Sequence, residues 1–130
     1  MKIKLLLLLL LTFSFSSFSQ NTAYVGQSET VTYEKAEIKP EFLGGYNAFL
    51  RYISENFKSP EVEGLSGTIK MSFVIEINGR VSSVKIVNDI GEGAGAEAAR
   101  VLKASPIWSP GEIEGVRVRV KMELPIKINN

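Results

Sequence analysis

Apolar and polar side chains alternate most regularly near the C-terminal end of the chain. From residue 116 to residue 128, Val, Met, Leu and Ile occupy the even positions, while Arg, Lys, Glu and Pro125 occupy the odd ones. This alternation predicts a strand with one buried face. Because proline has no amide proton to donate to a neighbouring strand, Pro125 predicts that the strand lies at the edge of a sheet.

Two further strands are predicted earlier in the chain. Residues 68–77 alternate in the same way, Asn78-Gly79 follows them, and residues 80–88 form a second apolar run. Asn-Gly is the pair best suited to a type I′ hairpin, so we expect the two strands to be antiparallel and Gly79 to be a structural residue. The second run departs from strict alternation, which indicates either a bulge or burial on both faces.

Two segments have helical spacing. Gly44-Gly45 marks the start of the first and Ser59-Pro60 its end, and its apolar residues fall on one side of a helix, which predicts that they belong to the core. These residues are Phe42, Tyr46, Phe49, Leu50, Ile53 and Phe57. The second helix runs from about residue 94 to residue 104, so the predicted order of elements is α-β-β-α-β.

The single tryptophan, Trp108, stands between Pro106 and Pro110. Because the two prolines fix the backbone on either side, we expect the indole to be buried between the sheet and the second helix. All three are therefore predicted to be structural residues.

Residues 1–19 have the layout of a secretory signal peptide. Lys2 and Lys4 precede an apolar stretch, and a small-x-small site ending at Ser19 precedes Gln20. The alternative is an uncleaved membrane anchor, although the apolar stretch is shorter than the roughly 20 residues that span a bilayer.

The rest of the chain divides into two parts. Residues 20–39 are polar and predict a tether, with a short strand at Thr30 to Tyr33. Residues 40–130 are predicted to form one domain.

The composition excludes several kinds of site. The chain has no histidine, no cysteine and a single aspartate, Asp89, so zinc sites and Ser-His-Asp or Cys-His catalysis cannot be built. Without Lys2 and Lys4 the formal net charge falls from +1 to −1, which gives no electrostatic case for binding nucleic acid. We therefore predict no metal, no cofactor and no nucleic-acid partner.

A glycine-rich stretch needs separate consideration, because Gly91, Gly93 and Ala96 match the spacing of a dinucleotide-binding turn. Such a turn connects parallel strands in a βαβ unit, whereas the strand before Gly91 belongs to an antiparallel hairpin. We therefore interpret Gly91, Gly93 and Gly95 as a flexible connection from strand to helix.

Four stretches occur in the order and spacing of the carboxy-terminal domain of TonB-family energy transducers: PEFLGGYNAFLRYISENFKSP, SGTIKMSFVIEINGRVSSVKIVN, EAARVLKASPIWSPG and GVRVRVKMELPIKI. The chain resembles that family from Pro40 to Ile128. The resemblance implies a non-enzymatic α+β domain in which two helices pack on a three-stranded antiparallel sheet. It also implies that the domain captures the short TonB box of an outer-membrane receptor by adding it as a strand beside the last strand.

The resemblance and the expected edge position of the last strand together predict the partner-binding residues. Main-chain groups of residues 116–121 are expected to pair with the incoming strand, while Arg117 and Arg119 meet acidic residues that flank it. The predicted site residues are Val116, Arg117, Val118, Arg119, Val120 and Lys121. A homodimer through the same edge is a further expectation.

Three classes of function remain open. A full transducer has a retained membrane helix and a long proline-rich spacer, whereas residues 20–39 contain no proline, so we expect a periplasmic module that binds an outer-membrane receptor or another envelope protein. The second class is a short transducer anchored in the inner membrane and facing the periplasm. The third is an enzyme or enzyme inhibitor on a similar scaffold, for which Glu55, Glu61 and Glu63 are the available carboxylates.

Overall fold

A computed structural model describes residues 29–130 of the chain. The expected signal peptide and the first part of the expected tether lie outside these residues. The described elements are β1 (Thr30–Thr32), the 3-10 helix η1 (Tyr33–Lys35), α1 (Tyr46–Asn56), β2 (Ser66–Ile75), β3 (Val81–Asn88), α2 (Ala94–Lys103), β4 (Gly111–Ile113) and β5 (Val116–Asn129).

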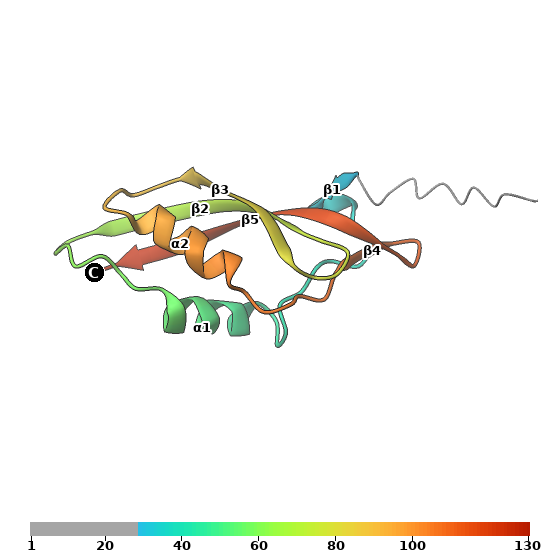
Figure 1. Cartoon of the computed structure of the whole chain (residues 1–130), viewed down its shortest axis with the longest axis horizontal. Coiled ribbons are helices and arrows are strands. Elements are labelled where there is room, and N and C mark those ends of the chain that lie inside the picture. Colours follow the sequence, from blue (N-terminus) through green and yellow to red (C-terminus); the bar gives the residue numbers. More distant parts are fainter. Residues whose placement is uncertain (1–28) are drawn as a thin grey trace, which may run out of the picture.

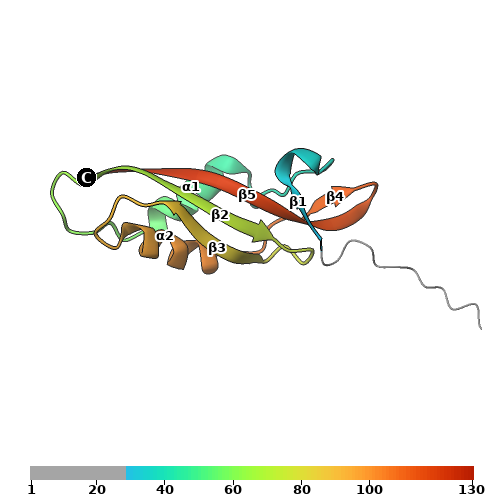
Figure 2. The ribbon, with the colours of Figure 1, turned by 90° about the horizontal axis from the view of Figure 1, so that it is seen from above.

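The domain has two layers, with both helices on the same side of one twisted sheet (Figure 1, Figure 2). The strand order is β1-β5-β2-β3, and β4 pairs with β5. β2 is antiparallel to both of its neighbours, β5 and β3, which confirms the predicted α+β fold with two helices on a three-stranded antiparallel arrangement. β4 was not predicted, and β1 joins the sheet as a parallel neighbour of β5.

The described part of the expected tether belongs to the folded domain. The short strand expected near Thr30 is β1, although Tyr33 already lies in η1. Ala36 is only 2% exposed and belongs to the core cluster. The domain therefore includes residues before Pro40.

The apolar residues predicted to line one side of the first helix do so only in part. Phe42 precedes the helix and Phe57 follows it, and within the helix Phe49 and Ile53 are buried. Tyr46 and Leu50 are 53% and 39% exposed, so the prediction that both belong to the core is wrong. The helix packs on the sheet through a narrower face than the sequence indicates, and it leaves apolar side chains at the surface.

The β2–β3 hairpin does not use the type I′ turn predicted at Asn78-Gly79. Its turn covers residues 76–79, closed by a 2.8 Å hydrogen bond from the Gly79 amide to the Glu76 carbonyl, and Gly79 alone has a positive φ, of 81°. The turn packs against a second chain segment, a contact that the local pair Asn-Gly cannot reveal: the Trp108 amide donates a 2.8 Å hydrogen bond to the Gly79 carbonyl. A two-residue turn with both φ values positive occurs instead at Glu114-Gly115, between β4 and β5.

β3 contains the expected irregularity in the form of a bulge. Ser83 has a φ of 49°, and the pairing with β2 shifts between Ser72 and Val74. The bulge lies on an outer strand of the sheet, where such features disfavour pairing with another chain.

Trp108 forms the centre of an aromatic cluster and is only 4% exposed. The centroids of the Phe42, Phe49 and Phe73 rings lie 5.3 to 5.7 Å from the indole, and the indole Nε1 donates a 2.8 Å hydrogen bond to Ser105 Oγ. The predicted burial is therefore correct, but these ring contacts come from α1, the segment before it and β2, not from α2. Of the flanking prolines, Pro106 is exposed and Pro110 half-buried.

The glycine-rich connection before α2 is organised by Asp89. Its Oδ1 accepts hydrogen bonds from the amides of Ile90, Gly91 and Gly95 at 2.8, 3.1 and 2.9 Å. A Cβ atom on Gly95 would overlap the carboxylate, which explains the glycine at this position. Three backbone amides of this connection are thus paired with a carboxylate of the chain itself.

Candidate functional site

β5 has a strand on one edge along most of its length. β2 pairs with residues 120–129 and β4 with residues 116–118. β1 pairs with residues 119–121. Because Val120 is opposite Ile75 of β2 and Val31 of β1 at the same time, β1 must lie on the other edge of β5.

The predicted binding residues do not form a free edge throughout. Arg119, Val120 and Lys121 already have a strand on each side, which corrects the expectation of an open backbone there. Among the six residues, Val118 and Val120 are buried, Arg119 is half-buried, and Val116, Arg117 and Lys121 are exposed. The alternation identifies the buried face correctly, but it carries no information about which backbone groups are paired.

Arg119 is held within the chain by Glu76. Its Nε lies 2.7 Å from Glu76 Oε2 and its Nη2 2.9 Å from Oε1, while Ser82 Oγ donates a 2.6 Å hydrogen bond to the same carboxylate. The hydrogen bond from Arg119 holds the pKa of Glu76 below its usual value, although burial opposes the shift. Arg119 is therefore engaged in a bidentate ion pair, which corrects the expectation that it extends toward a partner.

On the edge that β1 occupies, the longest open part of β5 lies further along the strand, at residues 122–129. Within the described chain, no strand pairs with these residues on the edge that β1 occupies earlier. Pro125 lies in this part, opposite Lys70 of β2 on the paired edge. Within residues 29–130, Pro125 therefore has a strand on one side only, as the sequence predicted for this residue.

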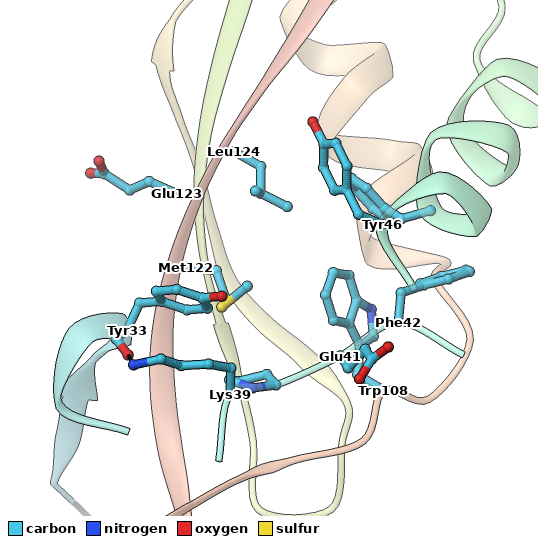
Figure 3. A pocket seen from close by; sticks show the side chains of 11 residues that line it. Tyr33, Lys39, Glu41, Phe42, Tyr46, Trp108, Met122, Glu123 and Leu124 are labelled. Atoms are coloured by element: carbon cyan, nitrogen blue, oxygen red, sulfur yellow. Dashed lines mark hydrogen bonds between the residues drawn. The ribbon is translucent and has the colours of Figure 1, made fainter. Parts of the chain in front are cut away.

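A hollow of about 450 Å³ lies beside the start of this open edge (Figure 3). It is lined by Tyr33, Lys39, Pro40, Glu41, Phe42, Tyr46, Phe49, Trp108, Met122, Glu123 and Leu124. In Figure 3, Tyr33 and Lys39 bound one end, and Tyr46 faces Leu124 across the opening. The walls are mainly aromatic and aliphatic, so the first hollow suits an apolar side chain.

A second hollow of about 490 Å³ follows along the same strand. Its lining comes from one side of α1 and from the end of β5: Tyr46, Leu50, Ile53, Ser54, Phe57, Ser59 and residues 125–130. Tyr46 lines both hollows. We call the two hollows together with the open backbone of residues 122–129 the edge groove.

The end of the edge groove near β1 is fixed by Lys39. Its Nζ donates hydrogen bonds to the carbonyls of Tyr33, Glu34 and Ala36 at 2.6, 3.1 and 2.7 Å, and lies 4.8 Å from the centroid of the Tyr33 ring. The side chain thereby ties η1 to the segment that leads into α1. The sequence reasoning missed this region because residues 33–39 show no periodicity.

Other kinds of site receive no support from the described part of the chain. Residues 29–130 contain no group of three or more His, Cys, Asp or Glu side chains that could hold a metal ion. Glu55, Glu61 and Glu63 are all exposed. No helix in the described part of the chain is long and apolar enough to cross a membrane.

The fold and the edge groove define a small α+β domain with one strand edge open to a partner. The chain belongs to the TonB C-terminal family, because the family described as Gram-negative bacterial TonB protein C-terminal matches residues 61–128. The chain is also similar to the solution structure of the TonB C-terminal domain of Helicobacter pylori, with 21% sequence identity and a TM-score of 0.47 over 67% of this chain and 85% of that chain. No curated protein matches the chain.

Family membership assigns the domain to TonB-type energy transduction to outer-membrane receptors. Domains of this family are associated with transport, are not enzymes and are periplasmic in Gram-negative bacteria.

Proposed function

We propose that the domain binds an extended segment of an outer-membrane receptor as an additional strand along residues 122–129 of β5. The observation that carries this proposal is an unpaired stretch of a central strand beside two apolar hollows. Strand addition uses both features, since open main-chain groups supply affinity and pockets for alternate side chains supply specificity.

The groove also indicates what kind of segment fits. Met122, Leu124, Ile126 and Ile128 occupy the even positions of β5, which point toward the helices. Side chains of an added strand alternate in the same way, so every second residue of the partner faces the hollows. We therefore expect apolar residues at alternate positions of the partner, and polar residues between them that lie beside Glu123 and Lys127 on the other face.

The central test is a titration of the isotope-labelled protein with synthetic peptides. The peptides cover the amino-terminal segments of TonB-dependent receptors encoded in the same genome, and binding is followed by amide shifts in NMR spectra. We expect the largest shifts at residues 122–129 and in α1 near Tyr46. Shifts confined to β3 or α2, with residues 122–129 unchanged, would refute strand addition at this edge.

A matched pair of variants on α1 sharpens the test. Ser54 and its neighbour Glu55 are both exposed, but only Ser54 lines the second hollow, and Glu55 lines neither. Ser54→Trp should fill the hollow and weaken peptide binding by about tenfold or more, which corresponds to about 1.4 kcal/mol. Glu55→Trp adds the same side chain one position along the helix and should leave the affinity unchanged.

The same edge could pair with a second copy of the chain, and this alternative has its own outcome. A homodimer through residues 122–129 would make the shifts at these residues depend on protein concentration in the absence of peptide. Sedimentation at several concentrations separates this result from receptor binding.

We further propose that the protein acts as a free periplasmic module after removal of residues 1–19. The charged start, the apolar stretch and the small residues before Gln20 support this proposal. Mass spectrometry of the exported protein should find an amino terminus at Gln20. An intact amino terminus in the membrane fraction would support the anchored transducer instead.

A further inference from the structure

β1 occupies the same edge of β5 that continues as the edge groove. It is a strand of 3 residues that pairs with Arg119, Val120 and Lys121, and the open stretch begins at the next residue, Met122. A partner strand that extended along β5 from Met122 toward Arg119 would therefore meet β1. The chain's own strand limits the length of edge that a partner can use.

β1 and η1 are attached to the domain by few buried contacts. Thr30 and Thr32 are exposed, Val31 is half-buried, and η1 has no buried residue. The chain becomes firmly anchored only at Ala36, which is 2% exposed. Short segments with exposed backbone and little buried apolar surface open at a lower free energy than the core of a domain.

The segment that follows β1 is anchored independently of it. The Ile38 amide donates a 3.1 Å hydrogen bond to the Glu112 carbonyl, and the Glu112 amide donates one of 2.9 Å to the Ile38 carbonyl. Residues before Ala36 can therefore leave the sheet while residues 36–38 keep their place.

The first hollow connects the edge groove to β1. Tyr33 follows β1 directly and lines this hollow together with Lys39, whose Nζ bonds the Tyr33 carbonyl (Figure 3). A partner side chain in the hollow would contact the two residues that hold η1 against the domain. Binding in the groove and the position of β1 are thus physically linked.

We propose that β1 is a displaceable cover over the first part of the partner edge. This inference rests on the proposed strand addition at residues 122–129. A short partner segment binds beside these residues and leaves β1 in place. A longer segment displaces β1 and pairs with residues 119–129, so the length of the partner decides whether β1 is released.

A reversible cross-link tests the proposal. Thr32 and Lys121 are register partners on β1 and β5, both are exposed, and the chain has no cysteine of its own. Thr32→Cys/Lys121→Cys should form one disulfide under oxidising conditions that holds β1 on the sheet. The probes are a long and a truncated version of the receptor peptide that gives NMR shifts with the unmodified protein.

We expect the oxidised variant to bind the long peptide about tenfold more weakly than the reduced variant, a difference of about 1.4 kcal/mol. The truncated peptide, which pairs only with residues 122–129, should bind equally to both forms. Lys70→Cys/Asn88→Cys is the matched control, because these exposed register partners join β2 to β3 and leave β1 free. The loss of the Lys70–Glu123 ion pair is the same in the oxidised and reduced forms of this variant, so it does not affect their comparison. Its oxidation should change neither affinity.

The outcomes separate the two proposals. Equal affinity of the oxidised and reduced Thr32/Lys121 variant for the long peptide would overturn the displacement of β1 and leave strand addition intact. Absence of binding in every form, including the unmodified protein, would refute both.

Hydrogen exchange in the peptide-free protein provides a second measurement. Amides in the β1–β5 pairing should exchange at least about a hundredfold faster than those between β2 and β5, because they are exposed by local opening of β1. Equal protection of the two sets would overturn the proposal, whatever the peptides do.

Discussion

Gly79→Ala provides a sharp test of how the hairpin and the tryptophan segment hold each other. Gly79 has a φ of 81°, and an added Cβ would overlap the Trp108 carbonyl oxygen and approach Ile107 Cγ2 to 2.6 Å. A residue other than glycine in this conformation costs about 1 to 2 kcal/mol. The overlap with a backbone atom forces the two segments apart and weakens the Trp108 amide to Gly79 carbonyl bond, worth about another 1 kcal/mol. We expect a total loss of about 2 to 3 kcal/mol in the free energy of unfolding.

Gly115→Ala is the matched control, because Gly115 has a φ of 74° and no atom within 4 Å of the added Cβ. It should show only the backbone strain of about 1 to 2 kcal/mol. Urea unfolding followed by fluorescence measures both variants, since Trp108 is the single tryptophan and is buried. Equal losses in the two variants would show that the contact with the Trp108 segment contributes nothing to stability.

Three further predictions concern the core, the charge network and the turn before α2. Trp108→Ala should lower the free energy of unfolding by about 3 to 5 kcal/mol in thermal or urea melts, the range for a buried large aromatic side chain; a loss below about 1 kcal/mol would contradict its place in the aromatic cluster. Hydrogen bonds from Arg100 and from a backbone amide lower the pKa of Glu97 from 4.5 to about 2. Its ionised form therefore stabilises the fold above pH 4.5, and this contribution, on the order of 1 kcal/mol for a partly exposed pair, is lost as the pH falls toward 2; Glu97→Gln should flatten the pH dependence of urea midpoints in that range. Gly95→Ala should destabilise by about 1 to 3 kcal/mol because of overlap with Asp89, and calorimetry should show that the loss disappears in an Asp89→Ala background.

Local patterns predict the parts of this fold that local physics determines. The alternation in β5 continues over 14 residues and the helical spacing in α2 over 10 residues. Each pattern repeats often enough to identify the element as a strand or a helix and to place most of its bounds. β1 could be indicated only as a short strand, because 3 residues carry too little periodicity to identify a partner. Its parallel pairing with β5 depends on contacts between segments far apart in the chain.

The turn and the site show the same limit. Asn78-Gly79 has the best local turn sequence, yet only Gly79 has a positive φ there, and a two-residue turn with both φ values positive occurs at Glu114-Gly115. The β2–β3 turn also contacts Trp108, a residue that is distant in the sequence. At the site, Pro125 predicts that β5 is unpaired on one edge, and this is correct at Pro125. The sequence cannot show that β1 covers the edge at residues 119–121, so it could not indicate that part of the predicted binding stretch is already paired within the chain.

Under the proposed strand addition, the edge groove has to stay available to a partner without promoting aggregation, and the arrangement of β5 is compatible with both requirements. An open strand edge is a template for pairing with any extended chain. Here Pro125 removes one amide donor from the strand, Lys127 adds a charge on its exposed face, and β1 closes the stretch at residues 119–121. The apolar surface of Tyr46 and Leu50 lies beside the edge on the helix, where it adds contacts only for a chain that already follows the groove. Selectivity for a particular segment then depends on the side chains that enter the two hollows, because the backbone edge alone would accept many sequences.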